Sequence, residues 1–203
     1  MQASTPNRGL HLLLLTAALG ACASTPPPEV TAPIALDGPA QRLDGERYLE
    51  YRVGVHIAAE PEVVWALLTD APGYPAWNST VISIDGTIAA GEEIALRAAI
   101  DPKRTFDLTV STFEPGQRLV WEDGGRAFKG VRTFTLTRRD DGSTDVTMAE
   151  VLTGSMMGMI EGKLPDFRPS FDEFAADLKR AAEGTADPGE RPASSAPATD
   201  SAA

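Results

Sequence analysis

Residues 60–78 read EPEVVWALLTDAPGYPAWN and predict two short helices. Pro61 suits the first turn of a helix, and the acidic residues on either side of it lie at the positive end of the helix dipole. The apolar run at 63–68 continues this helix. The Asp-Ala-Pro-Gly segment at 70–73 ends it, and residues 74–78 form a second short turn or helix.

One strand is predicted before these helices and six after them. Residues 48–58 alternate, with apolar side chains from Tyr51 to Ile57 on one face and His56 on the other. This pattern predicts a half-buried strand and a solvated surface histidine. The later runs are 80–84, 93–100, 105–113, 118–122, 128–137 and 144–153. Gly, Pro or Asp occurs in each short gap, so consecutive strands form hairpins in an antiparallel meander.

A long amphipathic helix is predicted at residues 169–183, where Phe171, Phe174, Leu178 and Ala181 recur at helical spacing. A curved antiparallel sheet with one apolar face needs a cover for that face, and this helix is the only large amphipathic element left. We therefore expect an α+β helix-grip fold. About seven strands wrap round the C-terminal helix, and two short helices follow the first strand.

Residues 45–183 resemble the START/Bet v1-like (SRPBCC) superfamily, in the branch named for polyketide cyclases and dehydratases. The segments that carry the resemblance are 60–70, 74–78, 116–121, 149–154 and 171–183. The resemblance implies a cavity between sheet and helix, usually apolar and open at one end. Members bind lipids, sterols, hormones or polyketides, and some are enzymes, so the motifs are specific for the fold and not for one function.

The N-terminus predicts export and lipid attachment. Residues 1–21 contain one positive charge, Arg8, and an apolar run of about ten residues, which is too short to span a bilayer. The run ends in Leu-Gly-Ala-Cys at 19–22, which resembles the lipobox of bacterial lipoproteins, so we expect Cys22 to be acylated after cleavage. Ala23 then favours the periplasmic face of the outer membrane. The alternative is an ordinary signal peptide with a chance cysteine.

The segments that flank the domain differ from it in composition. Residues 22–44 contain five prolines and little apolar periodicity, which predicts a semi-extended tether. Residues 184–203 are rich in Ala, Ser, Thr, Pro and Asp and predict a disordered tail. The expected folded domain is 45–183.

Composition excludes several classes of function. The formal net charge of −11 argues against a nucleic-acid partner, since binding phosphates needs clustered Lys and Arg. One cysteine and two histidines exclude an intramolecular disulfide and a four-ligand Cys/His zinc site. No phosphate-binding glycine loop occurs. We therefore expect no metal and no cofactor.

The hairpin at residues 140–142 predicts a pair of charged residues in the cavity. A three-residue loop with Gly in the left-handed position sets Phe134 opposite Met148 on one face, and sets Arg132 opposite Glu150 on the same face. The pair could fix the polar head of a ligand, or Glu150 could act as a base with a raised pKa. The alternative is a structural cross-strand ion pair near the rim.

The other candidates for ligand contact are apolar or aromatic. They are Trp77, Trp121, Phe106, Phe134, Met148, Met156, Met157, Phe171 and Phe174. Trp77 follows a turn at the expected mouth, and core packing is the alternative for every aromatic residue. Methionine adapts to varied apolar partners, so residues 154–165 predict either a mobile portal or a short helix packed on the core.

Three functions fit this sequence. The first is a lipid-anchored module that binds a small hydrophobic ligand, such as a lipid, an isoprenoid or a polyketide-like molecule. The second is an enzyme of the cyclase or dehydratase type, with Glu150 as base and Arg132 in support. The third is an envelope interaction module whose own side chains fill the cavity. A closed ion pair at Glu150 argues against the second, and a cavity volume near zero favours the third.

Overall fold

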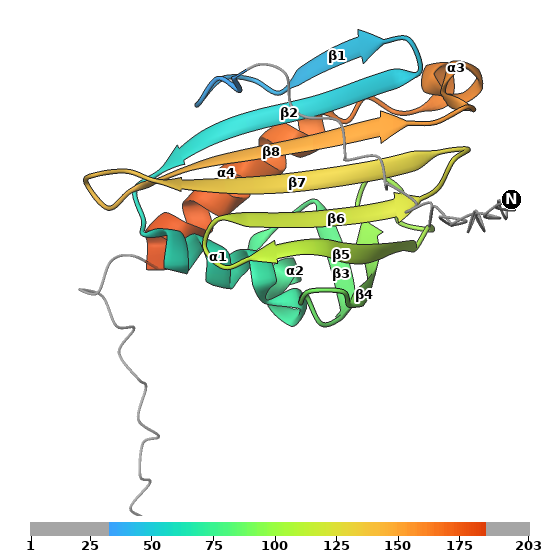
Figure 1. Ribbon diagram of the computed structural model, residues 1–203. Helices are drawn as coiled ribbons and strands as arrows, with labels where there is room; N and C mark the ends of the chain where they lie inside the picture. Colours follow the sequence, from blue (N-terminus) through green and yellow to red (C-terminus); the bar gives the residue numbers. More distant parts are fainter. Residues whose placement is uncertain (1–32, 186–203) are drawn as a thin grey trace, which may run out of the picture.

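A single antiparallel sheet curves round helix α4 in the computed structural model, which describes residues 33–185 (Figure 1). The strand order is β1-β2-β8-β7-β6-β5-β4-β3. The strands are β1 (Gln41–Gly45), β2 (Tyr48–Ile57), β3 (Val81–Gly86), β4 (Glu93–Ala98), β5 (Phe106–Glu114), β6 (Arg118–Gly124), β7 (Lys129–Arg138) and β8 (Thr144–Thr153). The helices are α1 (Pro61–Thr69), α2 (Tyr74–Trp77), α3 (Met157–Ile160) and α4 (Arg168–Thr185), with single 3-10 turns η1 (Ala71–Gly73) and η2 (Glu161–Lys163).

The predicted helix-grip fold is confirmed, and the element order is the expected one with one strand added. The extra strand, β1, lies almost wholly inside the segment 22–44 that the sequence predicts as a tether. It pairs antiparallel with β2, from Gln41 opposite Arg52 to Gly45 opposite Tyr48. The segment before it is also fixed, because Asp172 on α4 accepts a 2.6 Å hydrogen bond from the backbone N–H of Ala40. The folded domain therefore begins before residue 45.

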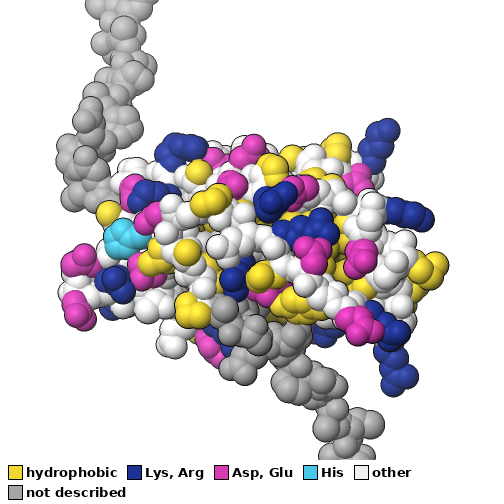
Figure 2. All heavy atoms as spheres, turned by 90° about the horizontal axis from the view of Figure 1, so that it is seen from above, with side chains coloured by type: hydrophobic (Ala, Val, Ile, Leu, Met, Phe, Trp, Pro, Cys, Tyr) yellow, Lys and Arg dark blue, Asp and Glu magenta, His cyan; other side chains and the backbone are white. Residues whose placement is uncertain are grey.

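Strand β1 forms one edge of the sheet, and its charges are paired locally. Arg42 and Asp44 form an ion pair of 2.7 Å. The space-filling view, which looks down on this edge, shows acidic and basic side chains close together (Figure 2). A short, charged edge strand discourages pairing with another chain. The predicted leader, Cys22 and the tail beyond Thr185 lie outside the described residues.

The core lies between the concave face of the sheet and α4 (Figure 1). Phe171, Phe174, Leu178 and Ala182 on α4 are each at most 2% exposed. Burial of each large apolar side chain stabilises the fold by roughly 1.5–3 kcal/mol. The predicted apolar stripe is thus confirmed, except that its last position is Ala182, whereas Ala181 is only half-buried.

Helices α1 and α2 pack near the C-terminal half of α4. The buried Tyr74 hydroxyl donates a 3.0 Å hydrogen bond to the Leu68 carbonyl and joins the two helices. Asp177 on α4 accepts hydrogen bonds from the backbone N–H and the hydroxyl of Ser79, at 2.7 and 2.6 Å. These bonds fix the chain between α2 and β3 to the long helix.

Candidate ligand cavity

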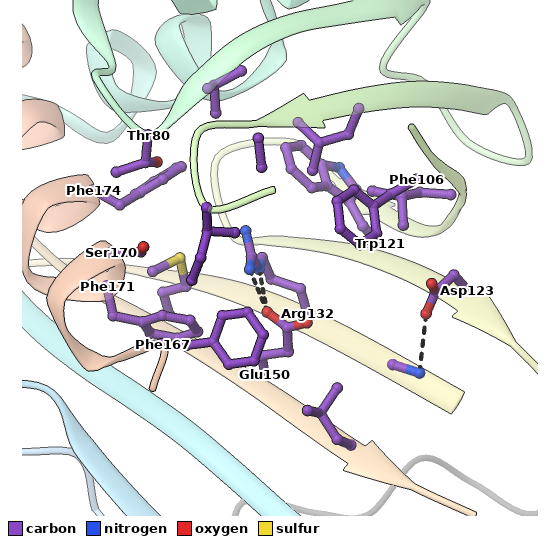
Figure 3. Close-up of a pocket in the computed structure, with 18 of the residues that line it drawn as sticks. Thr80, Phe106, Trp121, Asp123, Arg132, Glu150, Phe167, Ser170, Phe171 and Phe174 are labelled. Atoms are coloured by element: carbon purple, nitrogen blue, oxygen red, sulfur yellow. Dashed lines mark hydrogen bonds and ion pairs between the residues drawn. The ribbon is translucent and has the colours of Figure 1, made fainter. Parts of the chain in front are cut away.

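A cavity of about 130 Å³ lies between the concave face of the sheet and the N-terminal half of α4 (Figure 3). Its walls come from the start of β3, from the strands β4 to β8, from the β4–β5 and β6–β7 connections, and from residues 164–174. The lining residues are Thr80, Val81, Leu96, Ala98, Ile100, Arg104, Phe106, Leu108, Trp121, Asp123, Phe128, Gly130, Arg132, Met148, Glu150, Leu152, Leu164, Phe167, Ser170, Phe171 and Phe174. The cavity is therefore mainly apolar and aromatic, with two arginines and two carboxylates.

Arg132 and Glu150 form an ion pair in the wall of this cavity. The two residues lie directly opposite each other on β7 and β8, in the register that the hairpin at 140–142 predicts. Arg132 Nε lies 2.9 Å from Glu150 Oε2, and Nη2 donates to the same oxygen (Figure 3). The side chains are 22% and 20% exposed. The guanidinium carbon also lies 5.3 Å from the centroid of the Phe171 ring. Both groups are thus held in place by partners.

Asp123 is a second carboxylate in the cavity and was not among the predicted site residues. Its Oδ1 accepts a 3.1 Å hydrogen bond from the backbone N–H of Gly130 (Figure 3). Burial raises the pKa of the Asp123 carboxyl, and the negative charge of Glu150 acts in the same direction. Sequence alternation could have found it, because Asp123 follows Trp121 by two positions on β6 and faces the same side.

Arg104 is the other charged residue of the cavity that was not among the predicted site residues. It lies in the connection between β4 and β5, and its guanidinium carbon is 4.4 Å from the centroid of the Phe106 ring. Both side chains line the cavity, and Arg104 is exposed to solvent. A cation over an aromatic face is attracted by the ring quadrupole, so Phe106 helps to hold Arg104 at the rim.

The predicted aromatic residues divide into a lining set and a supporting set. Trp121 lines the cavity and is 1% exposed, and its indole N–H has no acceptor within the described part of the chain. Phe134 does not line the cavity. It packs edge-on against Trp121, with ring centroids 5.1 Å apart, and so lies behind it. Trp77 is also placed elsewhere: it packs on Tyr74 and Phe174, at 4.8 and 5.7 Å. Neither residue lines this cavity, and both pack in or against the core.

Met156 and Met157, which were predicted to contact ligand, do not line the cavity either. Residues 157–160 form the short helix α3, which was one of the two alternatives for this segment. Met157 is fully buried, whereas Met156 is 41% exposed. The backbone N–H of Met156 donates to the Ala127 carbonyl at 2.9 Å, which ties this segment to the β6–β7 hairpin. Leu164 and Phe167, further along the chain, reach the cavity instead.

Outside the cavity, His56 and the acidic side chains of residues 33–185 form no second site of a recognisable kind. His56 lies on the convex face, where its Nδ1 is 2.9 Å from Asp145 Oδ1, so it takes no part in the cavity. Within residues 33–185, no group of three His, Cys, Asp or Glu side chains is placed to hold a metal ion. No helix in the same range combines the length and the apolar character needed to cross a membrane.

Solved structures of several bacterial proteins share this fold. A conserved protein of unknown function from Enterococcus faecalis is 14% identical, with a TM-score of 0.53 over 73% of this chain and 79% of its own. A protein from Rhodobacter sphaeroides is 25% identical, with a TM-score of 0.51 over 69% of this chain and 95% of its own. DynU16, from the dynemicin biosynthetic locus, is 19% identical, with a TM-score of 0.52 over 70% of this chain and 49% of its own.

No curated protein matches the sequence of this chain. A family model does match, over residues 49–183, and its description is polyketide cyclase/dehydrase and lipid transport. The match covers nearly the whole folded domain, from β2 to the last turns of α4. The chain therefore belongs to the polyketide cyclase/dehydrase and lipid transport family.

Proposed function

We propose that this domain binds a small, mainly hydrophobic ligand in the cavity between the sheet and α4. The observation that carries the proposal is an apolar cavity of about 130 Å³ with a satisfied ion pair in its wall. Ligand sites are typically apolar pockets with a few placed polar groups, and this cavity has that character. A volume well above zero also argues against a domain that merely fills its own core.

The size of the cavity limits what it encloses. A cavity of roughly 150 Å³ lined by apolar side chains holds a benzene molecule. The enclosed part of the ligand is thus the size of one ring or a short branched chain. A longer body, such as an isoprenoid or acyl chain, extends past Arg104 and Leu164 toward solvent or requires the walls to move apart.

The role we propose for Arg132 and Glu150 is recognition of a polar group on the ligand. Glu150 is held in a closed ion pair, so it is a poor general base and a good fixed hydrogen-bond acceptor. Arg132 is in turn fixed against the Phe171 ring. A preorganised pair gives orientation to a ligand at little further entropic cost.

Native mass spectrometry tests binding. The Cys22→Ser chain, which cannot be acylated, is purified from a bacterial host without detergent. We expect a co-purifying apolar species on this protein and its loss from Ala98→Phe, because Ala98 lines the cavity and a phenyl ring fills it. Ala95→Phe is the matched control, since Ala95 lies on the same strand and does not line the cavity. An adduct that survives Ala98→Phe would contradict the proposal.

We further propose that the domain is lipid-anchored in the cell envelope, at the periplasmic face of the outer membrane. The support is the leader at 1–21 and the single cysteine at its end, followed by Ala23. An acyl anchor would keep the cavity close to a store of hydrophobic ligand. Incorporation of labelled palmitate should occur in the unaltered chain and cease in Cys22→Ser. An unlabelled protein that fractionates as soluble in both forms would refute the anchor.

A second candidate is acid–base catalysis, and Asp123 is the observation that favours it. A half-buried carboxyl with a raised pKa inside a ligand cavity is a usual feature of catalytic acids and bases. Glu150, the sequence-based candidate, is instead neutralised by Arg132. If the cavity is catalytic, the co-purified ligand changes mass on incubation with the protein and is unchanged with Asp123→Asn. An unchanged ligand with both proteins would exclude this candidate.

A further inference from the structure

We infer that the ligand of this cavity carries a carboxylate and that Arg104 binds it. The inference rests on the proposed function, because it names the chemistry of the ligand that the same cavity holds. Four charged residues line the cavity: Arg104, Arg132, Asp123 and Glu150. The charges of Arg132 and Glu150 neutralise each other in their ion pair. The groups that remain for a ligand are Arg104 and Asp123.

Arg104 forms no ion pair with an acidic side chain among residues 33–185, although the chain has 29 acidic residues against 18 basic ones. Within this range, the one carboxyl on which its charge acts is that of Asp123 in the same cavity, whose pKa it lowers. Arg138 pairs with Glu60 and Glu62, and Arg168 pairs with Asp166. In such an acidic protein, an arginine at the cavity rim that forms no ion pair has N–H groups available to an anion.

The geometry of Arg104 suits a planar anion. Its guanidinium lies over the Phe106 ring, so one face is covered by an apolar wall of the cavity. The N–H groups lie in the guanidinium plane and can donate two parallel hydrogen bonds to one anion. A carboxylate accepts such a pair, and an apolar group attached to it can enter the space beside Phe106.

Asp123 limits the charge that the ligand can carry. Its Oδ1 is engaged by the Gly130 N–H, which holds the carboxyl in the cavity wall rather than on Arg104. A ligand with two negative charges, such as a phosphate monoester, would meet stronger repulsion from Asp123 than a ligand with one. A single carboxylate gains the attraction of Arg104 with the least of this repulsion. The chemistry of the cavity therefore favours a monocarboxylate on an apolar body.

A matched pair of probes tests the inference. They are 3-phenylpropanoate and 3-phenylpropanamide, which share a ring of suitable size and differ in charge. Binding to the Cys22→Ser chain is measured by calorimetry and by the fluorescence of the tryptophans, one of which, Trp121, is in the cavity wall. We expect the carboxylate to bind at least about tenfold more tightly than the amide, as a charge-assisted contact implies.

Two variants locate the charge that matters. Arg104→Met keeps an unbranched apolar side chain and should abolish the preference for the carboxylate without weakening the amide. Lys103→Met removes the same charge from the neighbouring position, which does not line the cavity, and should leave both affinities within about twofold. If both probes bind equally, or if Lys103→Met reduces the preference as much as Arg104→Met, the inference is overturned while the proposed function stands. If neither probe binds, the proposed function is overturned and the inference with it.

Discussion

A Cβ atom on Gly130 would lie 2.6 Å from Oδ1 of Asp123, so the glycine on β7 makes room for the carboxylate on β6. The two residues are also cross-strand partners, and the Gly130 N–H donates to that same oxygen. The missing side chain and the hydrogen bond together fix one acidic group in the cavity wall.

Replacement of Gly130 by Ala should displace Asp123 and break its hydrogen bond. The expected loss of stability is about 1 kcal/mol, the usual value for a hydrogen bond to a partly buried group. Urea unfolding of Gly130→Ala, Asp123→Ala and the double variant measures the coupling between the two sites. If the loss of unfolding free energy in the double variant equals the sum of the two single losses, the contact between Gly130 and Asp123 does not affect stability.

Asp123→Asn should stabilise the protein more at neutral pH than in acid. The pKa of Asp123 is raised in the folded state, so the folded protein binds more protons than the unfolded chain between the two pKa values, and stability falls as the pH rises through this window. Asn cannot ionise and can still accept the Gly130 hydrogen bond. Thermal unfolding should show an increase of about 1–3 °C at pH 7, shrinking toward zero near about pH 3. An equal shift at both pH values would point to a cause other than ionisation.

Loss of one partner of the Arg132–Glu150 pair should cost more than loss of both. Glu150→Gln leaves the Arg132 charge in a mainly apolar wall, and we expect destabilisation of about 1–3 kcal/mol. The double variant Arg132→Met with Glu150→Leu replaces both groups by apolar side chains of similar size and should recover much of that loss. Urea unfolding measures all three. If the double variant is less stable than Glu150→Gln, the ion pair itself stabilises the fold, beyond each partner's neutralising the other's charge.

Deletion of β1 should weaken the domain although the family match begins at residue 49. A chain that starts at residue 46 lacks the strand and the bond between Ala40 and Asp172, and it leaves β2 as an unpaired edge. We expect a lower melting temperature and concentration-dependent aggregation, measured by calorimetry and light scattering, relative to a chain that starts at residue 33. Equal behaviour of the two chains would show that β1 is dispensable.

Much of the fold and one pair of site residues could be predicted from the sequence, because local patterns determine them. Alternation gave the strands, and the Gly at position 142 gave the hairpin register that places Arg132 opposite Glu150. Gly142 has a φ of 86°, in the left-handed region where glycine is favoured. Once this register is set, every side chain on β7 and β8 is assigned to one face.

The rest depends on contacts between distant segments. Strand β1 contains one apolar residue, Leu43, among polar ones, so its five residues show no apolar alternation. It forms because β2 offers it an edge. Asp123 precedes two glycines, which predicted a turn, yet β6 continues to Gly124. The position of the Arg104 side chain depends on its contact with the Phe106 ring. The position of Met156 depends on the hydrogen bond from its backbone N–H to the Ala127 carbonyl. None of these is encoded by spacing along the chain.

The pairing of β2 with β8 has a consequence for how the chain folds. Tyr48 lies opposite Thr153 and Ile57 opposite Thr144, so an early strand has its partner close to the other end of the domain. The loop between such partners must close before the contact is gained, which slows folding. During synthesis or export, the apolar side chains of Val53 and Val55 on β2 lack their cross-strand partners until β8 has emerged. A chain that ends before Thr144 therefore leaves β2 with an unpaired, apolar edge. We expect no stable fold from the N-terminal half alone, because β2 needs β8 as its partner.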